Sequence, residues 1–153
     1  MLIQYDLYQD TKNKKHYLKK VKEYDIYAWK CDKPDFINSF CLNELEFNEL
    51  AEERLYMLAL NTALYPIALF ELSKGSVNAT IFSIRSILIR LLLCGAVKFV
   101  LVHNHPSLDE TPSQEDINMF KKVKEASKLI EIDLLDNIII GEKYFSFYEN
   151  EIY

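Results

Sequence analysis

KFVLVHNHPSLDETPSQED, residues 98–116, contains the most informative pattern in this chain. Lys98–Val102 is apolar and rich in β-branched side chains, and it lies between Gly95 and Pro106, so it predicts a short buried strand. His103 and His105 follow at the end of this strand. Side chains two apart in an extended chain point to the same side, so the two imidazoles could bind one cation.

A helix is expected to begin soon after the histidines. Thr111 is suited to the N-cap position and Pro112 to the first helical position. Ser113 and Asp116 then lie three residues apart on the first turn, where S-x-x-D is also typical of a capping box. Two imidazoles and one carboxylate would give three protein ligands and an open fourth position, as in catalytic zinc sites.

The segments H-N-H-P-S (103–107) and T-P-S-Q-E-D (111–116) resemble the JAMM signature of JAB/MPN-type metalloproteases, most closely in its RadC-like branch. The resemblance covers about Leu42–Tyr148 and includes G-S-V-N-A (75–79) and L-L-D-N-I-I-I-G (134–141). It implies an α/β (α+β) fold, a cytidine-deaminase-like three-layer sandwich with a mixed sheet.

The resemblance also implies roles for individual residues. His103, His105 and Asp116 would bind Zn²⁺, and Ser113 would hydrogen-bond a developing oxyanion. Glu71, in the family-like segment E-L-S-K-G-S (71–76), would be the catalytic glutamate that takes a proton from water. From the residues alone, a glutamate in an apolar strand could instead face solvent at a sheet edge. The expected reaction is hydrolysis of a peptide or isopeptide bond in a peptide or protein substrate.

Two positions depart from the family pattern. Leu108 replaces a common glycine after H-N-H-P-S, which changes the turn at the mouth of the site. Asn137 replaces a histidine that could support a metal ligand or bind substrate. Neither change affects the expected ligands, but both leave open a catalytically silent protein-binding module.

A basic segment lies near the N-terminus. Six of the 18 Lys and Arg residues fall between Thr11 and Lys22, with no acid among them: Lys12, Lys14, Lys15, Lys19, Lys20 and Lys22. Lysines are often used to protect a solvated edge strand. An anionic partner such as nucleic acid is the alternative, in keeping with the association of RadC-like proteins with DNA repair. Longer RadC-like proteins carry a helix-hairpin-helix region, for which Met1–Cys41 is too short.

The 153 residues suffice for one globular domain. We expect residues 1–41 to form an N-terminal arm and residues 42–153 the metal-dependent hydrolase domain. The predicted elements are loosely patterned strands in 1–8 and 18–29, a helix beginning near Pro34, a solvated acidic connector (Glu44, Glu46, Glu49, Glu52, Glu53), a hairpin of 54–61 and 65–72, a helix over 84–94, a helix over 113–130, and strands over 134–140 and 144–148.

The cysteines and the apolar segments predict a cytoplasmic protein without a membrane span. Cys31, Cys41 and Cys94 are odd in number and widely spaced, which is typical of reduced thiols and not of zinc ligands. The apolar stretch 81–102 is interrupted by charged residues and by Gly95, so it predicts a core helix and a strand.

Overall fold

The computed structural model describes residues 1–26, 29–75 and 83–153, in which seven strands form one mixed sheet. The order across the sheet is β2-β1-β4-β3-β5-β6-β7. The strands are β1 Leu2–Gln9, β2 His16–Tyr24, β3 Glu53–Leu60, β4 Pro66–Gly75, β5 Lys98–Asn104, β6 Asp133–Ile140 and β7 Tyr144–Ser146. The helices are α1 Pro34–Asn43, α2 Ile84–Cys94 and α3 Gln114–Lys128. Tyr27, from the predicted N-terminal strand, and residues 76–79, from the G-S-V-N-A segment, lie outside the described residues.

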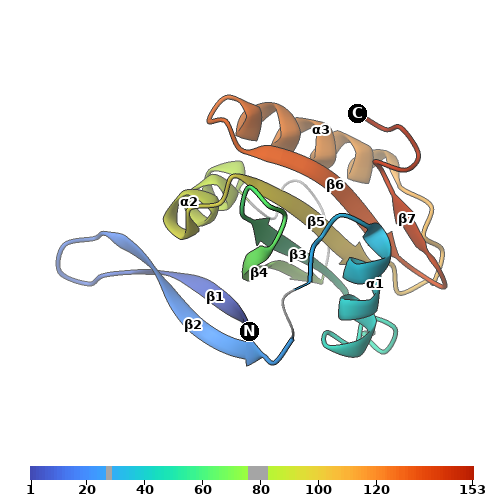
Figure 1. The fold of residues 1–153 in the computed structure, drawn as a ribbon, viewed down its shortest axis with the longest axis horizontal. Helices are drawn as coiled ribbons and strands as arrows, with labels where there is room; N and C mark the ends of the chain where they lie inside the picture. The colour runs from blue at the N-terminus through green and yellow to red at the C-terminus, as the bar shows by residue number, and fades with distance from the viewer. Residues whose placement is uncertain (27–28, 76–82) are drawn as a thin grey trace.

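The helices cover both faces of the sheet. Apolar residues of α2 and α3, including Ile87, Leu91 and Phe120, pack with one face of the strands. Ile37 and Phe40 of α1 pack on the other face. Figure 1 shows α3 lying along β6, with α1 on a separate side of the sheet. The expected α/β three-layer arrangement with a mixed sheet is therefore confirmed, and it agrees with the JAB/MPN fold.

The central strands β3 and β5 are apolar on both sides because both faces of the sheet are covered. Alternate residues of β5 enter different cores: Phe99 and Leu101 face α2 and α3, whereas Val100 and Val102 face α1. β5 pairs antiparallel with β3 and parallel with β6. The strand predicted over Lys98–Val102 is confirmed, but it continues two residues further to Asn104.

The N-terminal strands belong to the same sheet as the rest of the chain. β1 pairs with β2 along its length and with β4 at Gln4 and Leu69, which leaves β2 as the edge strand. The division expected between residues 41 and 42 falls inside α1 and stays a prediction.

The cysteines are free thiols. Cys31 and Cys41 are buried and Cys94 is partly buried. Burial raises the pKa of the Cys31 thiol to about 12, so this group stays protonated at neutral pH.

Among the helices of the described ranges, none combines the length and the apolar character needed to cross a bilayer.

Two buried asparagines on neighbouring strands provide a test of the packing. Asn137 is fully buried, and neither polar atom of its side chain has a hydrogen-bonding partner among the described residues. Asn104 is equally buried, but its side chain makes two hydrogen bonds to the backbone around β3. An unpaired buried polar group costs roughly 1–3 kcal/mol. We expect Asn137→Leu to leave the free energy of unfolding unchanged or raised, and Asn104→Leu to lower it by about 1–3 kcal/mol. Urea unfolding of the two variants checks this, and equal losses would contradict it.

Candidate metal centre

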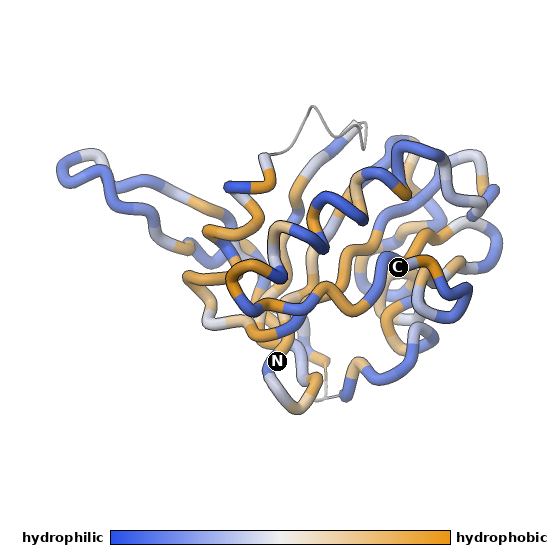
Figure 2. The backbone as a smooth tube through the Cα atoms, turned by 90° about the horizontal axis from the view of Figure 1, so that it is seen from above, coloured by the Kyte–Doolittle hydropathy of each residue, from blue (hydrophilic) through white to orange (hydrophobic). Residues whose placement is uncertain are grey.

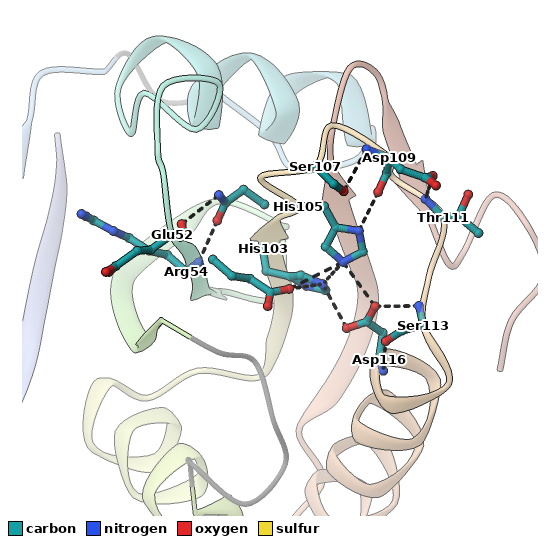
Figure 3. A network of polar contacts seen from close by, with 11 residues as sticks. Glu52, Arg54, His103, His105, Ser107, Asp109, Thr111, Ser113 and Asp116 are labelled. Atoms are coloured by element: carbon teal, nitrogen blue, oxygen red, sulfur yellow. Dashed lines mark hydrogen bonds and ion pairs between the residues drawn. The ribbon is translucent and has the colours of Figure 1, made fainter.

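Four side chains from three parts of the fold converge at one end of β5. His103 lies in β5, His105 follows it, Asp116 is in the first turn of α3, and Glu53 begins β3. Each offers one nitrogen or oxygen atom, and these atoms all lie within 4.8 Å of one another. Figure 3 shows His103, His105 and Asp116 pointing toward one another, with Ser113 at the start of α3.

The spacing of the donor atoms fits a tetrahedral ion. Ligands about 2.0–2.1 Å from a tetrahedral zinc lie about 3.3 Å from one another. The Nε2 atoms of His103 and His105 are 3.2 Å apart. Asp116 Oδ1 lies 3.1 Å from His103 Nε2, and Asp116 Oδ2 lies 3.3 Å from His105 Nε2. The two imidazoles and this carboxylate could therefore hold one metal ion.

The ring orientation of His105 suits a metal ligand. Its Nδ1 lies 2.7 Å from the backbone carbonyl oxygen of Asp109. A carbonyl can only accept, so Nδ1 carries the hydrogen and donates it. In the neutral imidazole the lone pair is then on Nε2, which faces the cluster.

The electrostatics of the cluster favour a cation. Burial alone would raise the pKa of Asp116, but hydrogen bonds from His103 and His105 hold this pKa far below its usual range. The hydrogen bond to Asp116 raises the pKa of His105, against the opposing effect of burial. Asp116 is thus ionised at all ordinary pH values, and it provides a buried negative charge that a metal ion would offset.

Ser113 caps α3 and fixes the position of Asp116. The Asp116 backbone N–H donates to Ser113 Oγ at 3.1 Å, and the Ser113 N–H donates to Asp116 Oδ2 at 2.8 Å. The expectation of Thr111 as N-cap and Pro112 as first helical residue was wrong, because this reciprocal pair starts the helix at Gln114. The capping-box interpretation of S-x-x-D is confirmed, and the same carboxylate also contacts both imidazoles.

Glu53 is the cluster residue that the sequence analysis missed. Its Oε1 lies 3.6 Å from His105 Nε2 and 3.9 Å from His103 Nε2, slightly further than the oxygens of Asp116. The sequence predicts Glu53 to be part of the solvated acidic connector, but it is half-buried at the first position of β3. The only local signal was that it directly precedes the predicted strand.

Asn104, between the two histidines, holds the backbone on both sides of Glu53. Asn104 Oδ1 accepts from the Arg54 N–H at 2.7 Å, and its Nδ2 donates to the Glu52 carbonyl at 3.1 Å. Both contacts are drawn in Figure 3, where Glu52 and Arg54 lie beside the histidines. The asparagine side chain continues the pairing of β3 with β5 past its last residue pair, Leu55 with His103. Asn104 therefore fixes the backbone at Glu53, and with it the position of the Glu53 carboxylate relative to the imidazoles.

The structure does not bring Glu71 to this cluster. Glu71 lies in β4, and its Oε2 accepts a hydrogen bond from the Tyr56 hydroxyl at 3.3 Å. Tyr56 packs in the core on the α1 side of the sheet, whereas Leu55, the partner of His103, packs on the other side. Burial, with the nearby charge of Glu71, raises the pKa of Tyr56 to about 12, so Tyr56 remains a neutral donor.

The two departures from the family pattern have different structural settings. Leu108 has a φ of 65°, in the left-handed region that favours glycine, which costs a leucine roughly 1 kcal/mol. Leu108 is half-exposed on the loop after His105, so it can affect access to the site. Asn137 is fully buried in β6 and cannot contact a substrate directly.

A mixed sheet that presents two imidazoles at a strand end and a carboxylate on the next helix defines an α/β domain with a candidate metal centre. Comparison with known families agrees: residues 31–152 match the RadC-like JAB domain. The chain belongs to this family.

Several UPF0758 proteins are similar to this chain. One from Clostridium tetani is 42% identical over 108 residues, which cover 70% of this chain and 47% of that protein. One from Alkaliphilus metalliredigens is 38% identical over 120 residues, covering 78% of this chain and 51% of that protein. The chain thus spans about half the length of the curated relatives it matches.

The protonation of the ligands predicts how metal binding depends on pH. A ligating imidazole must be deprotonated, so metal binding releases protons. The pKa of His105 is raised above its usual 6.5. We expect full zinc affinity above that raised pKa and, below it, a fall of about tenfold per pH unit for each proton displaced. Competition with a chromogenic chelator between pH 5.5 and 8 measures this, and a pH-independent affinity would contradict it.

The close approach of Gly141 to the loop after His105 provides a second prediction. A Cβ at Gly141 would lie 2.6 Å from the Leu108 carbonyl oxygen and 2.9 Å from the Glu110 nitrogen, so the loop must shift. Groups that orient metal ligands typically contribute about 10–100-fold to affinity. We expect Gly141→Ala to lower zinc affinity by at least about tenfold.

Gly95→Ala is the matched control for Gly141→Ala. Gly95 has a φ of 71° and no heavy atom near its added Cβ, so alanine there strains only the end of α2. We expect Gly95→Ala to lower the free energy of unfolding by about 1 kcal/mol while zinc affinity stays at the parental value. If the two variants lost zinc affinity equally, the loss would reflect general destabilisation.

Proposed function

We propose that this protein is a zinc-dependent hydrolase that cleaves amide bonds, either peptide or isopeptide, in peptide or protein substrates. The single observation that supports this most strongly is the arrangement of His103, His105 and Asp116 at tetrahedral spacing, with Glu53 beside them. Two imidazole nitrogens and a carboxylate oxygen are typical ligands of a catalytic zinc, which keeps one position for water or substrate.

When bound, a zinc ion would act as a Lewis acid on the scissile carbonyl and would lower the pKa of the attacking water. The donor set suits zinc because it combines imidazole nitrogen with carboxylate oxygen.

Glu53 is the proposed general base. Its carboxylate oxygen lies 3.6 Å and 3.9 Å from the two imidazole nitrogens, which leaves it adjacent to the ligands while Asp116 makes the closer contacts. From there it would accept a proton from water and deliver it to the leaving amine, a role typically worth 10²–10⁴-fold in rate. Glu71, assigned this role by resemblance, lies across the sheet with Tyr56, so its position favours Glu53 instead.

Ser113 is the proposed donor to the oxyanion. Its Oγ accepts from the Asp116 N–H, and a hydroxyl that accepts in this way keeps its own hydrogen for donation. Ser113 is exposed at the start of α3, next to a ligand, so this hydrogen can point toward a bound substrate. One such donor is worth a few kcal/mol of transition-state stabilisation.

Two matched substitutions test the assignment of the base. Glu53→Gln should retain stoichiometric zinc but lose turnover by about 10²–10⁴-fold, because glutamine cannot accept the proton. Glu71→Gln should retain both zinc and turnover. Turnover is measured on zinc-loaded protein with quenched fluorescent peptides carrying either main-chain or lysine-linked scissile bonds, and zinc by elemental analysis.

The other outcomes are equally informative. Loss of turnover in Glu71→Gln with normal rates in Glu53→Gln would assign the base to Glu71. A zinc-loaded parent protein that cleaves neither class of peptide would favour a catalytically silent protein-binding module. If the parent failed to retain zinc, the hydrolase proposal would be wrong.

A further inference from the structure

The hairpin of β1 and β2 projects from the rest of the domain. Only Gln4 of β1 pairs with β4, so the outer part of the hairpin extends beyond the sheet, as Figure 1 shows. Figure 2 shows that its tip is hydrophilic. The tip is a short turn in which the Asp10 side chain accepts hydrogen bonds from the N–H groups of Lys12 and Asn13.

One face of the hairpin presents two exposed aromatic rings. Tyr8 and Tyr17 are directly paired across the strands, with ring centroids 6.0 Å apart. They are 41% and 44% exposed. The ammonium group of Lys19 lies 4.8 Å from the centroid of Tyr8, so a cation lies on the same face as the rings. The opposite face is occupied, because Tyr5 and Leu18 pack against the core under α2.

The six lysines of the hairpin carry a largely uncompensated positive charge. Within this hairpin, Asp6 pairs with Arg90 of α2 and Glu23 pairs with Lys20. Asp10 is occupied by the backbone of the turn. Among the described residues, Lys20 is the single lysine of the six that has a carboxylate partner. The chain as a whole has a net charge of −5, so the charge of the hairpin contrasts with that of the rest of the protein.

Protection of the sheet edge explains part of this pattern. β2 is the edge strand, and lysines at an edge discourage pairing with other chains. Edge protection accounts for Lys19, Lys20 and Lys22. It accounts neither for the three lysines of the tip nor for two large aromatic rings left in solvent beside them.

We propose that this face of the hairpin binds single-stranded nucleic acid, with Tyr8 and Tyr17 stacking on bases and with Lys19 and the three lysines of the tip contacting phosphates. Proteins that bind single strands combine a positively charged surface with aromatic side chains, because every base has a face for stacking. Bases in an intact duplex are already stacked, so exposed tyrosines favour a single strand. This binding is independent of the hydrolase proposed above.

Fluorescence anisotropy with the full chain tests the proposal, using 20-nucleotide single strands of DNA and RNA and a duplex of matched sequence. We expect tighter binding to a single strand than to the duplex. Comparison of the DNA and RNA single strands shows which of the two nucleic acids the surface prefers. Affinity should fall as salt is raised, and each phosphate contact on a single strand steepens the fall of log affinity with log salt by about 0.7.

Two sets of variants separate charge from stacking. Lys12→Gln/Lys14→Gln/Lys15→Gln should weaken binding at least tenfold and reduce the salt slope by about 2. Tyr8→Ala/Tyr17→Ala should weaken it at least about fivefold with the slope unchanged, because stacking on a base is not ionic. Lys121→Gln/Lys122→Gln/Lys128→Gln removes equal charge from the exposed side of α3 and should leave the affinity within twofold of the parent.

Several results would overturn the proposal. One is an equal loss of affinity for the single strand in the hairpin and α3 lysine variants. Others are equal affinity of the parent for the duplex and the single strands, or an unchanged affinity after the tyrosine substitutions. Tighter binding to vesicles containing anionic phospholipid, with the same lysine dependence, would assign the surface to membranes instead. Circular dichroism and thermal unfolding of each variant verify that the substitutions leave the fold intact.

Discussion

The antiparallel pairing of β3 with β5 is the constraint on which the metal centre depends. Because the strands run in opposite directions, the first residue of β3 lies beside the last residues of β5. The pair of Leu55 with His103 sets the register, and the side chain of Asn104 extends it to Glu52 and Arg54. A shift of one residue would turn every side chain of the strand to the other face. It would move Glu53 away from the imidazoles.

The loop after β5 is held by backbone hydrogen bonds to the end of β6 and to the turn that follows it. The His105 N–H donates to the Ile140 carbonyl at the end of β6, and the Glu142 N–H donates to the Leu108 carbonyl. Gly141 permits this close approach because a side chain there would overlap the backbone of the loop. The left-handed conformation of Leu108 is the local cost of a turn that also places the Asp109 carbonyl against His105. The position of His105 is therefore determined by β5 and β6 together.

The metal centre and the basic hairpin differ in how far their charged and polar side chains are buried. At the centre, Asp116 lies buried against His103 and His105, and hydrogen bonds lower the pKa of Asp116 and raise the pKa of His105 against the effect of burial. On the hairpin, the lysines and the rings of Tyr8 and Tyr17 are exposed to solvent. Burial suits a site that must hold one small ion rigidly. Exposure suits a surface that would contact an extended polyanion by electrostatic attraction, which is sensitive to salt.

Short-range patterns in the sequence are sufficient to predict several local elements of the fold. These include the buried strand before His103, the apolar helix that ends at Gly95, and a helix that places Asp116 in its first turn. H-x-H in an extended chain places both imidazoles on one side, because strand side chains alternate. The helix nevertheless begins two residues later than Thr111 and Pro112 predict, because Ser113 and Asp116 form the reciprocal hydrogen bonds that cap it.

Which glutamate lies beside the histidines depends on how the strands pair, and short-range patterns do not predict it. Glu53 is separated from His103 by 50 positions in sequence and reaches it only through the pairing of β3 with β5. The direction of the Glu71 side chain depends on an irregularity in the pairing of β3 with β4. Leu55 pairs with Ser73, but the next residue, Tyr56, pairs with Glu71, so Leu72 is an extra residue in β4. Strict alternation would have placed Glu71 on the same face as Ser73 and His103. The bulge turns it to the face of Tyr56, and no local pattern in the sequence predicts such a bulge, because it arises from how two strands distant in sequence fit together.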